Sequence, residues 1–299
     1  MAKSDDTRTR PKTLGPAVAG TWYPSAAGEL EQQVDGFLSV PQPSTDEASS
    51  EGLTALISPH AGLVYSGAVA GQGFARLRGR SLQRVLLMGP SHYASFQGAC
   101  LPEADAFRTP LGSVPLDREM IELAGRHPGF RIDDGPFAPE HCLEAEIPFL
   151  QRTLAPGWKL VPVLLGGGSL DRSIRQIVDA LAPLLDAGTL VVVSSDFTHY
   201  GPAFGYVPFR ELVPERLRQL DMGAVERILD LDRDGFDDYV AETGATICGR
   251  VAIDVLLGML APETRTELVA YDTSGRMTGD WNHSVSYACI SFSRADTTA

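Results

Sequence analysis

The chain alternates between short, continuous apolar runs and longer segments in which apolar residues recur at helical spacing. Apolar runs of strand length lie near residues 54–58, 84–89, 158–165, 189–195, 266–272 and 284–292. Helical spacing is found near residues 29–38, 66–78, 117–126, 142–154, 170–186, 211–230, 234–243 and 249–260. Val- and Leu-rich runs without polar alternation are typical of parallel strands that helices cover on both faces. The pattern therefore predicts an α/β fold with helices on both faces of a sheet.

Three segments of the chain differ from this pattern. Apolar and polar residues alternate from Ser284 to Ile290, so part of the sheet is expected to be antiparallel. Residues 1–14 are polar without periodicity and are predicted to be a disordered tail, and residues 41–50 have the composition of a loop. Because no repeat and no second core is visible, residues 15–295 are predicted to form one domain. Its expected architecture is a three-layer α/β/α sandwich with a largely parallel, partly mixed central sheet.

The amino-acid composition argues against several classes of binding partner. The chain has 25 lysines and arginines against 38 aspartates and glutamates, which gives a formal charge of −13. Nucleic acids and anionic membranes are bound by clustered basic residues, so neither is expected as a partner. No apolar run reaches the ~20 residues that span a bilayer, and the first residues lack the apolar core of a secretory signal, so a cytoplasmic location is expected. The four cysteines contain no C-x-x-C pair, which argues against a disulfide framework or a zinc knuckle.

Two histidines follow proline-containing turns at the ends of apolar runs. His60 follows Ser58-Pro59, and His92 follows Gly89-Pro90-Ser91. In parallel sheets, ligands bind in the crevice beyond the carboxyl ends of the strands. One such histidine alone is more simply explained by a hydrogen bond within its loop. Two in equivalent positions favour a transition-metal site, because neutral imidazole is the commonest ligand of such metals.

The most apolar run of the chain also ends in polar groups. Residues 190–193 are followed by Ser194-Ser195-Asp196-Phe197-Thr198-His199. Asp196 can ligate a metal, orient an imidazole or act as a base. The alternative is that Asp196 caps a helix, which would leave His199 unexplained. The position at a strand end favours a functional role for both residues.

Two further segments place polar groups at predicted helix starts. His141 and Glu144 lie on one side of a first turn and can converge on a site, although a glutamate that complements the helix dipole is an equally good explanation. Cys248 precedes another helix, where the helix terminus and Arg250 would both favour the thiolate. A lone cysteine is more often a small buried hydrophobe, and the other three cysteines are assigned to the core on that ground.

Several blocks of the chain, taken together and in order, resemble those of the Memo family. They are Gly20-Thr21-Trp22-Tyr23-Pro24, Ser58-Pro59-His60-Ala61-Gly62, Gly89-Pro90-Ser91-His92, Glu140-His141-Cys142-Leu143-Glu144, Ser194-Ser195-Asp196-Phe197-Thr198-His199-Tyr200-Gly201, Thr246-Ile247-Cys248-Gly249-Arg250, Trp281 and Ser284-Val285-Ser286-Tyr287-Ala288. The resemblance spans residues 17–293. Prokaryotic members form the AmmeMemoRadiSam group (system protein B), named for co-occurrence with an AMMECR1-like protein and a radical-SAM protein. The resemblance therefore implies these two proteins as partners.

The resemblance also implies a fold similar to that of class III extradiol dioxygenases. Those enzymes hold Fe(II) with two histidines and one carboxylate, and use a further histidine as acid and base. By position, His60 and His92 match the two ligating histidines, and His199 matches the acid/base histidine. Memo proteins carry a cysteine in place of the carboxylate, and Cys248 is that residue here. By the same resemblance, Asp196 can contribute to metal binding.

The cysteine changes the chemistry that is expected of the site. A thiolate is softer than a carboxylate, so it shifts the metal preference toward copper or zinc and makes the ligand itself oxidisable. We therefore predict a metal-binding protein with one iron or copper ion, with Zn²⁺ as a further candidate, that is suited to redox chemistry and shows little or no ring cleavage. His141 and His199 are predicted to handle protons. Glu144, Ser195 and Arg250 are predicted to surround the ligands.

Two alternatives stay open on the sequence alone. The first is a non-catalytic scaffold that uses the crevice to bind a protein or peptide, although the negative charge makes phosphopeptide capture less attractive. The second is a metal-free enzyme in which Cys248 is the nucleophile and His199 or His60 its base. Metal content and thiol reactivity distinguish the two from the metal-binding prediction.

Overall fold

The computed structural model describes residues 12–39, 52–167 and 171–295. The predicted loop at 41–50 and residues 1–11 of the predicted tail lie outside these ranges. At the other end of that tail, Thr13–Leu14 form strand β1, which pairs in parallel with β5 (Ala106–Thr109). The ordered fold therefore includes residues that polar composition assigned to the tail.

Helices lie where the apolar spacing predicts them, with a short addition, α10, before the last strand. Their bounds are α1 (Ala27–Leu38), α3 (Leu63–Phe74), α4 (Arg118–Ala124), α5 (Ile147–Thr153), α6 (Asp171–Leu181), α7 (Val213–Leu229), α8 (Arg233–Thr243), α9 (Arg250–Met259) and α10 (Ser274–Thr278). None of the helices in the described ranges combines the length and the apolar content that a membrane span requires.

The predicted strands are all present, and shorter ones join them. The long strands are β2 (Leu53–Ser58), β3 (Arg84–Pro90), β8 (Lys159–Leu165), β9 (Thr189–Ser194), β11 (Arg265–Thr273) and β12 (Ser284–Ser293). The short strands are β4 (Ala99–Leu101), β6 (Gly112–Pro115), β7 (Phe130–Ile132) and β10 (His199–Tyr200), besides β1 and β5. The short strands were not predicted, because runs of two to four residues carry too little periodicity to be distinguished from loops.

One large sheet organises the molecule. Its strand order is β10-β12-β2-β9-β3-β8-β4-β7, and β11 is added against β12. The central strands β2, β9, β3 and β8 are parallel neighbours. The last strands of the chain are antiparallel, since β12 pairs antiparallel with β2 and with β11. The prediction of a largely parallel, partly mixed sheet is confirmed, while β1, β5 and β6 form a separate small sheet.

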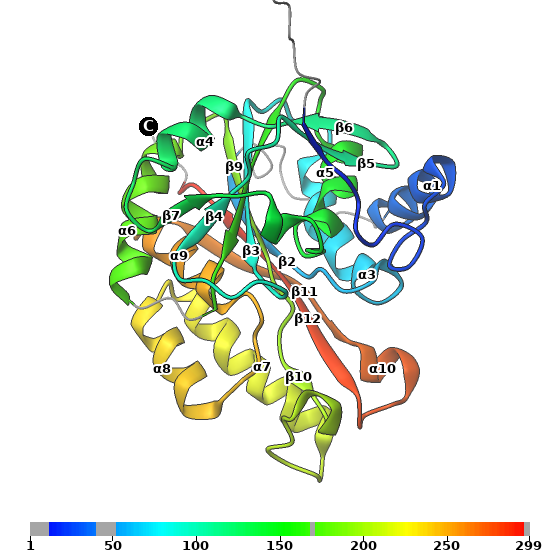
Figure 1. The fold of residues 1–299 in the computed structure, drawn as a ribbon. Coiled ribbons are helices and arrows are strands. Elements are labelled where there is room, and N and C mark those ends of the chain that lie inside the picture. Colours follow the sequence, from blue (N-terminus) through cyan, green and yellow to red (C-terminus); the bar gives the residue numbers. More distant parts are fainter. Residues whose placement is uncertain (1–11, 40–51, 168–170, 296–299) are drawn as a thin grey trace, which may run out of the picture.

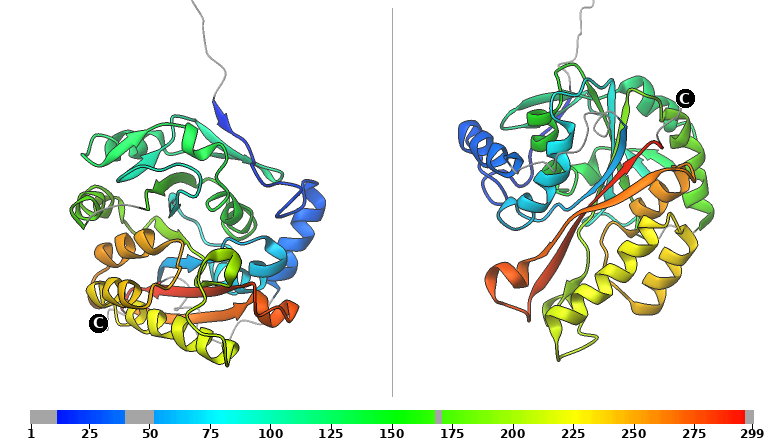
Figure 2. Two further views of the ribbon diagram at one scale, coloured as in Figure 1. Left: turned by 60° about the horizontal axis from the view of Figure 1, so that its bottom comes forward. Right: turned by 180° about the vertical axis from the view of Figure 1, so that it is seen from behind.

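Helices cover both faces of the large sheet, which makes the predicted three layers (Figures 1 and 2). Helices α1, α3 and α5 pack together on one face, where α3 contacts β2, β11 and β12. On the other face α9 contacts β3 and β9, and α6 and α8 pack against α9. Strands β2 and β9 are buried along nearly their whole length, as two-sided coverage requires.

Two glycines of α3 allow α1 to approach it closely. A Cβ atom at Gly67 would lie 2.4 Å from the ring of Phe37, and one at Gly71 would lie 2.4 Å from the Phe37 carbonyl oxygen. These residues are one helical turn apart on α3, so together they form a flat strip against α1. The buried positions of α1 (Leu30, Val34 and Leu38) recur every four residues and face the same contact side. Small residues on α3 thus allow α1 to pack closely against it.

Candidate metal centre

Three neighbouring parallel strands end at the same edge of the sheet and deliver polar residues there. β2 ends at Ser58, β3 at Pro90 and β9 at Ser194, and β9 lies between the other two. His60, His92 and Asp196 each stand two residues beyond the end of their strand. The crevice position predicted from the strand-end rule is therefore occupied by the residues that the sequence singled out.

His60, His92 and Cys248 bring their donor atoms together. One ligand atom from each lies within 4.8 Å of the other two, and the Nε2 atom of His60 is 3.4 Å from the Sγ atom of Cys248. For a tetrahedral ion with usual bond lengths, a nitrogen and a sulfur ligand are about 3.6 Å apart. The two-nitrogen, one-sulfur donor set and its spacing fit a transition metal such as iron, copper or zinc.

Hydrogen bonds on the far side of each ring orient the two histidines. The Nδ1 atom of His60 is 2.8 Å from the Oγ atom of Ser194, and the Nδ1 atom of His92 is 2.8 Å from the Oε1 atom of Glu140. Partners of this kind fix the tautomer of a metal-binding imidazole and the direction of its ring. In both rings Nε2 is then the nitrogen that is left for a metal ion.

Glu140 is a site residue to which sequence reasoning gave no role. Besides the His92 ring, its carboxylate accepts hydrogen bonds from the backbone N–H groups of His92 (2.6 Å), His141 (2.9 Å) and Cys142 (3.1 Å). Burial alone would raise the pKa of Glu140, but the hydrogen bonds and charge of His92 hold that pKa at about 2. The signal in the sequence was an acidic residue directly before His141, but nothing there indicated that it would reach His92.

Replacing Glu140 by glutamine should lower the affinity of the site for a metal ion by about 10- to 100-fold, because the His92 ring loses its charged orienting partner. The measurement is a competition titration with a chromophoric chelator. Glu29→Gln, at an exposed position in α1, removes the same charge far from the site and should leave the affinity unchanged. Equal affinities in Glu140→Gln and wild type would remove Glu140 from the site.

Asp196 supports the loop of His60 rather than joining the three donors. Its Oδ1 atom accepts hydrogen bonds from the backbone N–H groups of His60 (2.9 Å) and Ala61 (3.3 Å). Neither of the two groups of potential metal ligands in the described ranges includes Asp196. Burial raises the pKa of this carboxyl. The neighbouring Ser195 bridges to the start of α9, since its Oγ atom accepts from the N–H of Gly249 at 3.0 Å.

The surroundings of Cys248 favour the neutral thiol and not the thiolate that was expected. Part of its side chain is accessible, but burial of the sulfur, followed by the negative charge of Asp196, raises the pKa of the thiol. Arg250 does not counter this, because its guanidinium pairs with Asp237 at 2.8 Å. The predicted lowering of the thiol pKa by the helix start and Arg250 is therefore wrong. A metal ion that binds here displaces the thiol proton itself.

The two histidines predicted to handle protons have different surroundings. The His141 ring stacks on His92, with centroids 4.6 Å apart, and its buried Nδ1 atom is 3.4 Å from the Oε1 atom of Glu140 without forming a hydrogen bond. Burial, together with His60 and His92, lowers the pKa of His141 to about 4. His199 is tied to Thr246, whose carbonyl oxygen is 3.1 Å from the His199 Nδ1 atom.

Glu144 faces away from the donors and binds the N-terminal segment. Its carboxylate accepts hydrogen bonds from the backbone N–H groups of Ala17 and Val18 and from the hydroxyl of Tyr23. That segment also carries Trp22, whose ring centroid lies 4.2 Å from the His141 ring. Glu144 therefore serves the site indirectly, by fixing the segment that covers His141.

Replacing Glu144 by alanine should lower the free energy of unfolding by about 3 kcal/mol, because it leaves buried donors without an acceptor at about 1–3 kcal/mol each. The change is measured by denaturant unfolding. Glu144→Gln keeps one acceptor oxygen and should cost clearly less. A loss in the alanine variant no larger than that in the glutamine variant would contradict the role given to the carboxylate.

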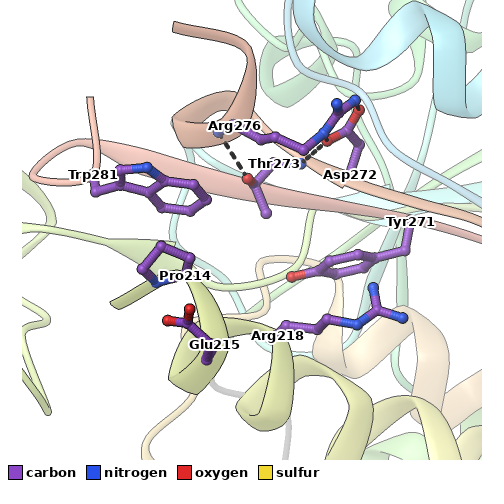
Figure 3. Close-up of a pocket in the computed structure, with 8 residues that line it drawn as sticks. All are labelled: Pro214, Glu215, Arg218, Tyr271, Asp272, Thr273, Arg276 and Trp281. Carbon is purple, nitrogen blue, oxygen red and sulfur yellow. Dashed lines mark hydrogen bonds and ion pairs between the residues drawn. The ribbon is translucent and has the colours of Figure 1, made fainter. Parts of the chain in front are cut away.

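A separate cleft of about 320 Å³ lies between the first turns of α7, the end of β11, and α10 (Figure 3). Its lining residues are Pro214, Glu215, Arg218, Tyr271, Asp272, Thr273, Arg276 and Trp281. The hydroxyl of Tyr271 donates to the buried Asp221 at 2.7 Å, and Asp221 accepts from the N–H of Thr198 at 3.2 Å. One buried carboxylate thus connects a wall of this cleft with the loop of His199, but no metal-site donor lines the cleft.

Known proteins resemble the chain over nearly its whole length. It is 31% identical to a MEMO1 family protein of Pyrococcus horikoshii over 93% of this chain and 99% of the relative. A MEMO1 family protein of Nitrosopumilus maritimus is 30% identical over 93% and 98%, and the memo-1 homolog of Caenorhabditis elegans is 32% identical over 80% and 69%. Among solved structures, an uncharacterized protein of Escherichia coli K12 is 13% identical with a TM-score of 0.49, and the match covers 80% of this chain and 99% of that chain.

The family comparison agrees with these relatives. The model described as "Memo-like protein" matches residues 15–291, which include the three strand ends and the start of α9. The resemblance found in the sequence blocks is confirmed, and this chain belongs to the Memo family.

Proposed function

We propose that the protein binds one iron or copper ion through His60, His92 and Cys248. The observation that supports this is the grouping of one donor atom from each residue within 4.8 Å of the others. His60 follows β2 and His92 follows β3, the two strands that flank β9 in the sheet. Cys248 comes from the start of α9, far along the chain. Packing alone gives no reason for two imidazole nitrogens and a thiol sulfur to face one another in this way.

The donor set suits iron, copper or zinc and leaves open positions on the metal. Two imidazoles and one thiolate fill three coordination positions, which leaves room for a small molecule. Iron or copper bound here would supply one-electron chemistry. Glu140 and Ser194 hold the two imidazoles, and Ser195 holds the helix start that carries Cys248. In this proposal the fold is used as in class III extradiol dioxygenases, with a cysteine in place of the carboxylate.

We assign proton exchange with a bound molecule to His141 and His199. The His141 ring lies 5.6 Å from the His60 ring and 4.6 Å from the His92 ring, between centroids, and its buried Nδ1 atom is 3.4 Å from the Oε1 atom of Glu140. The exposed Tyr93 ring stands 5.8 Å from the His141 ring, between centroids. A molecule at the metal would therefore lie beside aromatic rings, and the neutral imidazole of His141 among them is able to take a proton.

The test is the metal content of protein that is purified anaerobically without a histidine tag. About one iron or copper per chain, retained through gel filtration, supports the proposal. One zinc per chain would keep the site but overturn its redox role. Metal-free protein whose Cys248 reacts rapidly with a thiol reagent at neutral pH would favour a cysteine nucleophile. Metal-free protein with an inert Cys248 would leave only a scaffold that binds proteins or peptides.

A further inference from the structure

The carboxyl group of Glu146 lies completely buried behind His60, and it is not one of the groups that hold the metal ligands described above. Glu146 has no exposed surface and stands at the end of the short helical turn that precedes α5. Its Oε1 atom is 2.9 Å from the Oγ atom of Ser194. The same Oγ atom is 2.8 Å from the Nδ1 atom of His60. Glu146 is therefore connected to a metal ligand through one hydroxyl.

The number of available protons decides how this cluster is bonded. The Ser194 hydroxyl has one proton, yet it lies within hydrogen-bond distance of two oxygens, Glu146 Oε1 and the Cys142 carbonyl at 2.7 Å. If His60 uses Nε2 for the metal, its Nδ1–H donates to Ser194 and supplies no acceptor. With an ionised Glu146, Ser194 can donate to only one of the two oxygens. With a neutral Glu146, the carboxyl donates to Ser194, Ser194 donates to Cys142, and every contact has one proton.

We propose that Glu146 is a neutral carboxylic acid that positions His60 through Ser194 and releases its proton when a metal ion occupies the site. The proposal rests on the metal binding proposed above. The proton balance is simple: the Glu146 O–H bond breaks, the proton passes to the buffer, and the new carboxylate accepts the Ser194 hydroxyl. The Cys142 carbonyl gives up that hydrogen bond in exchange.

The surroundings of Glu146 agree with the neutral form. Burial raises its pKa to about 8, against the lowering effects of the hydrogen bonds with Ser194 and Ser58. The titratable groups that act on it directly are Asp196, Cys142 and Cys289, from a strand end, the turn before α5 and β12, and His60 lies beyond Ser194. At neutral pH none of them offers a fixed positive charge. A metal cation on the far side of the His60 ring would be that charge, and it favours the carboxylate.

The neutral acid can be tested without any metal. Infrared spectra of the apo protein should show the C=O stretch of a protonated carboxyl that disappears near pH 8 and is missing in Glu146→Gln. The glutamine amide keeps the shape of the acid and donates to Ser194, so the variant should fold. A protonated-carboxyl signal that is the same in wild type and variant across this range would overturn the proposal. The wild-type spectra are also sufficient by themselves. If no protonated-carboxyl signal disappears near pH 8, Glu146 is not a neutral acid.

The link to the metal is tested by counting protons. Zn²⁺, which is not redox-active, is titrated calorimetrically at pH 7 into both proteins in buffers of different ionisation enthalpy. Wild type should release more protons per Zn²⁺ than Glu146→Gln, by about a half to one proton. Equal proton release would overturn the link. If Zn²⁺ binds to neither protein while the infrared step is present, the metal-binding proposal fails and the neutral acid stands.

Discussion

Replacing Cys248 by serine should abolish stoichiometric iron or copper in the purified protein. The three donors are drawn from different parts of the chain, and the sulfur lies 3.4 Å from the Nε2 atom of His60. A serine hydroxyl is a weak, protonated ligand at neutral pH, so the site would keep two imidazoles and no anionic donor. We expect the affinity to fall by more than about 100-fold, the upper end of the effect of losing an orienting partner alone. The measurement is metal content together with a chelator competition.

Two companion variants make this result specific. His92→Ala removes a different donor from the same group and should lose the metal as well. Cys100→Ser changes a buried cysteine in β4 whose sulfur is 3.4 Å from the Asp133 carbonyl, outside the donor group, and should retain the metal. Retention of a full metal equivalent by Cys248→Ser would show that another residue completes the site. Loss in all three variants would indicate general destabilisation instead.

The central sheet could be predicted because each of its main strands is marked by a local pattern. β2, β3 and β9 are continuous apolar runs that end in residues unsuited to a core, and all three are buried in the structure. The strand-end rule then placed His60, His92 and Asp196 at one edge without knowledge of the strand order. Alternation from Ser284 onward likewise marked β12 as an antiparallel strand. In each case the information lies within about ten residues of sequence.

The parts that could not be predicted depend on long-range contacts. β1 is two residues long and exists through its pairing with β5, which lies more than ninety residues later. Glu140, Glu144 and Glu146 occur within seven consecutive residues, yet one meets the His92 ring, one the N-terminal segment and one Ser194. The turn geometry sends neighbouring carboxylates in different directions. Spacing on an assumed helix therefore predicted Glu144 near the metal ligands. In the structure it is Glu140 whose carboxylate contacts the His92 ring.

The thiol of Cys248 illustrates a different limit. A helix start and a neighbouring arginine are real reasons for a low thiol pKa, and both are visible in the sequence. The depth of the sulfur and the partner of the arginine are not visible. In the structure burial and Asp196 raise the thiol pKa, while Arg250 pairs with Asp237. Local electrostatic arguments thus need the fold before they give even the sign of a shift.

Replacing Gly249 by alanine should disturb the site from outside the donor set. A Cβ atom there would lie 2.4 Å from the Cβ atom of Ser195 and 3.0 Å from the carbonyl oxygen of Ser194. Neither neighbour can move easily, because the Ser195 N–H is bonded to the Ser58 carbonyl at 2.8 Å and so to the sheet. The start of α9 must shift instead, and Cys248 shifts with it. We expect a loss of about 1–3 kcal/mol in the free energy of unfolding, as for other overpacked sites, and a weaker affinity for metal.

The backbone angles make this a test of contact alone. Gly249 has φ −87°, which alanine adopts freely, so any loss arises from the clash with Ser195. Gly28, the second residue of α1 and exposed, has no atom within 4 Å of its Cβ position. Gly28→Ala should therefore stabilise the protein by at most about 0.5–1 kcal/mol, because the position lies in the first helical turn, with unchanged metal affinity. If Gly249→Ala unfolded and bound metal like wild type, the contact between α9 and the β9 loop would not be what positions Cys248.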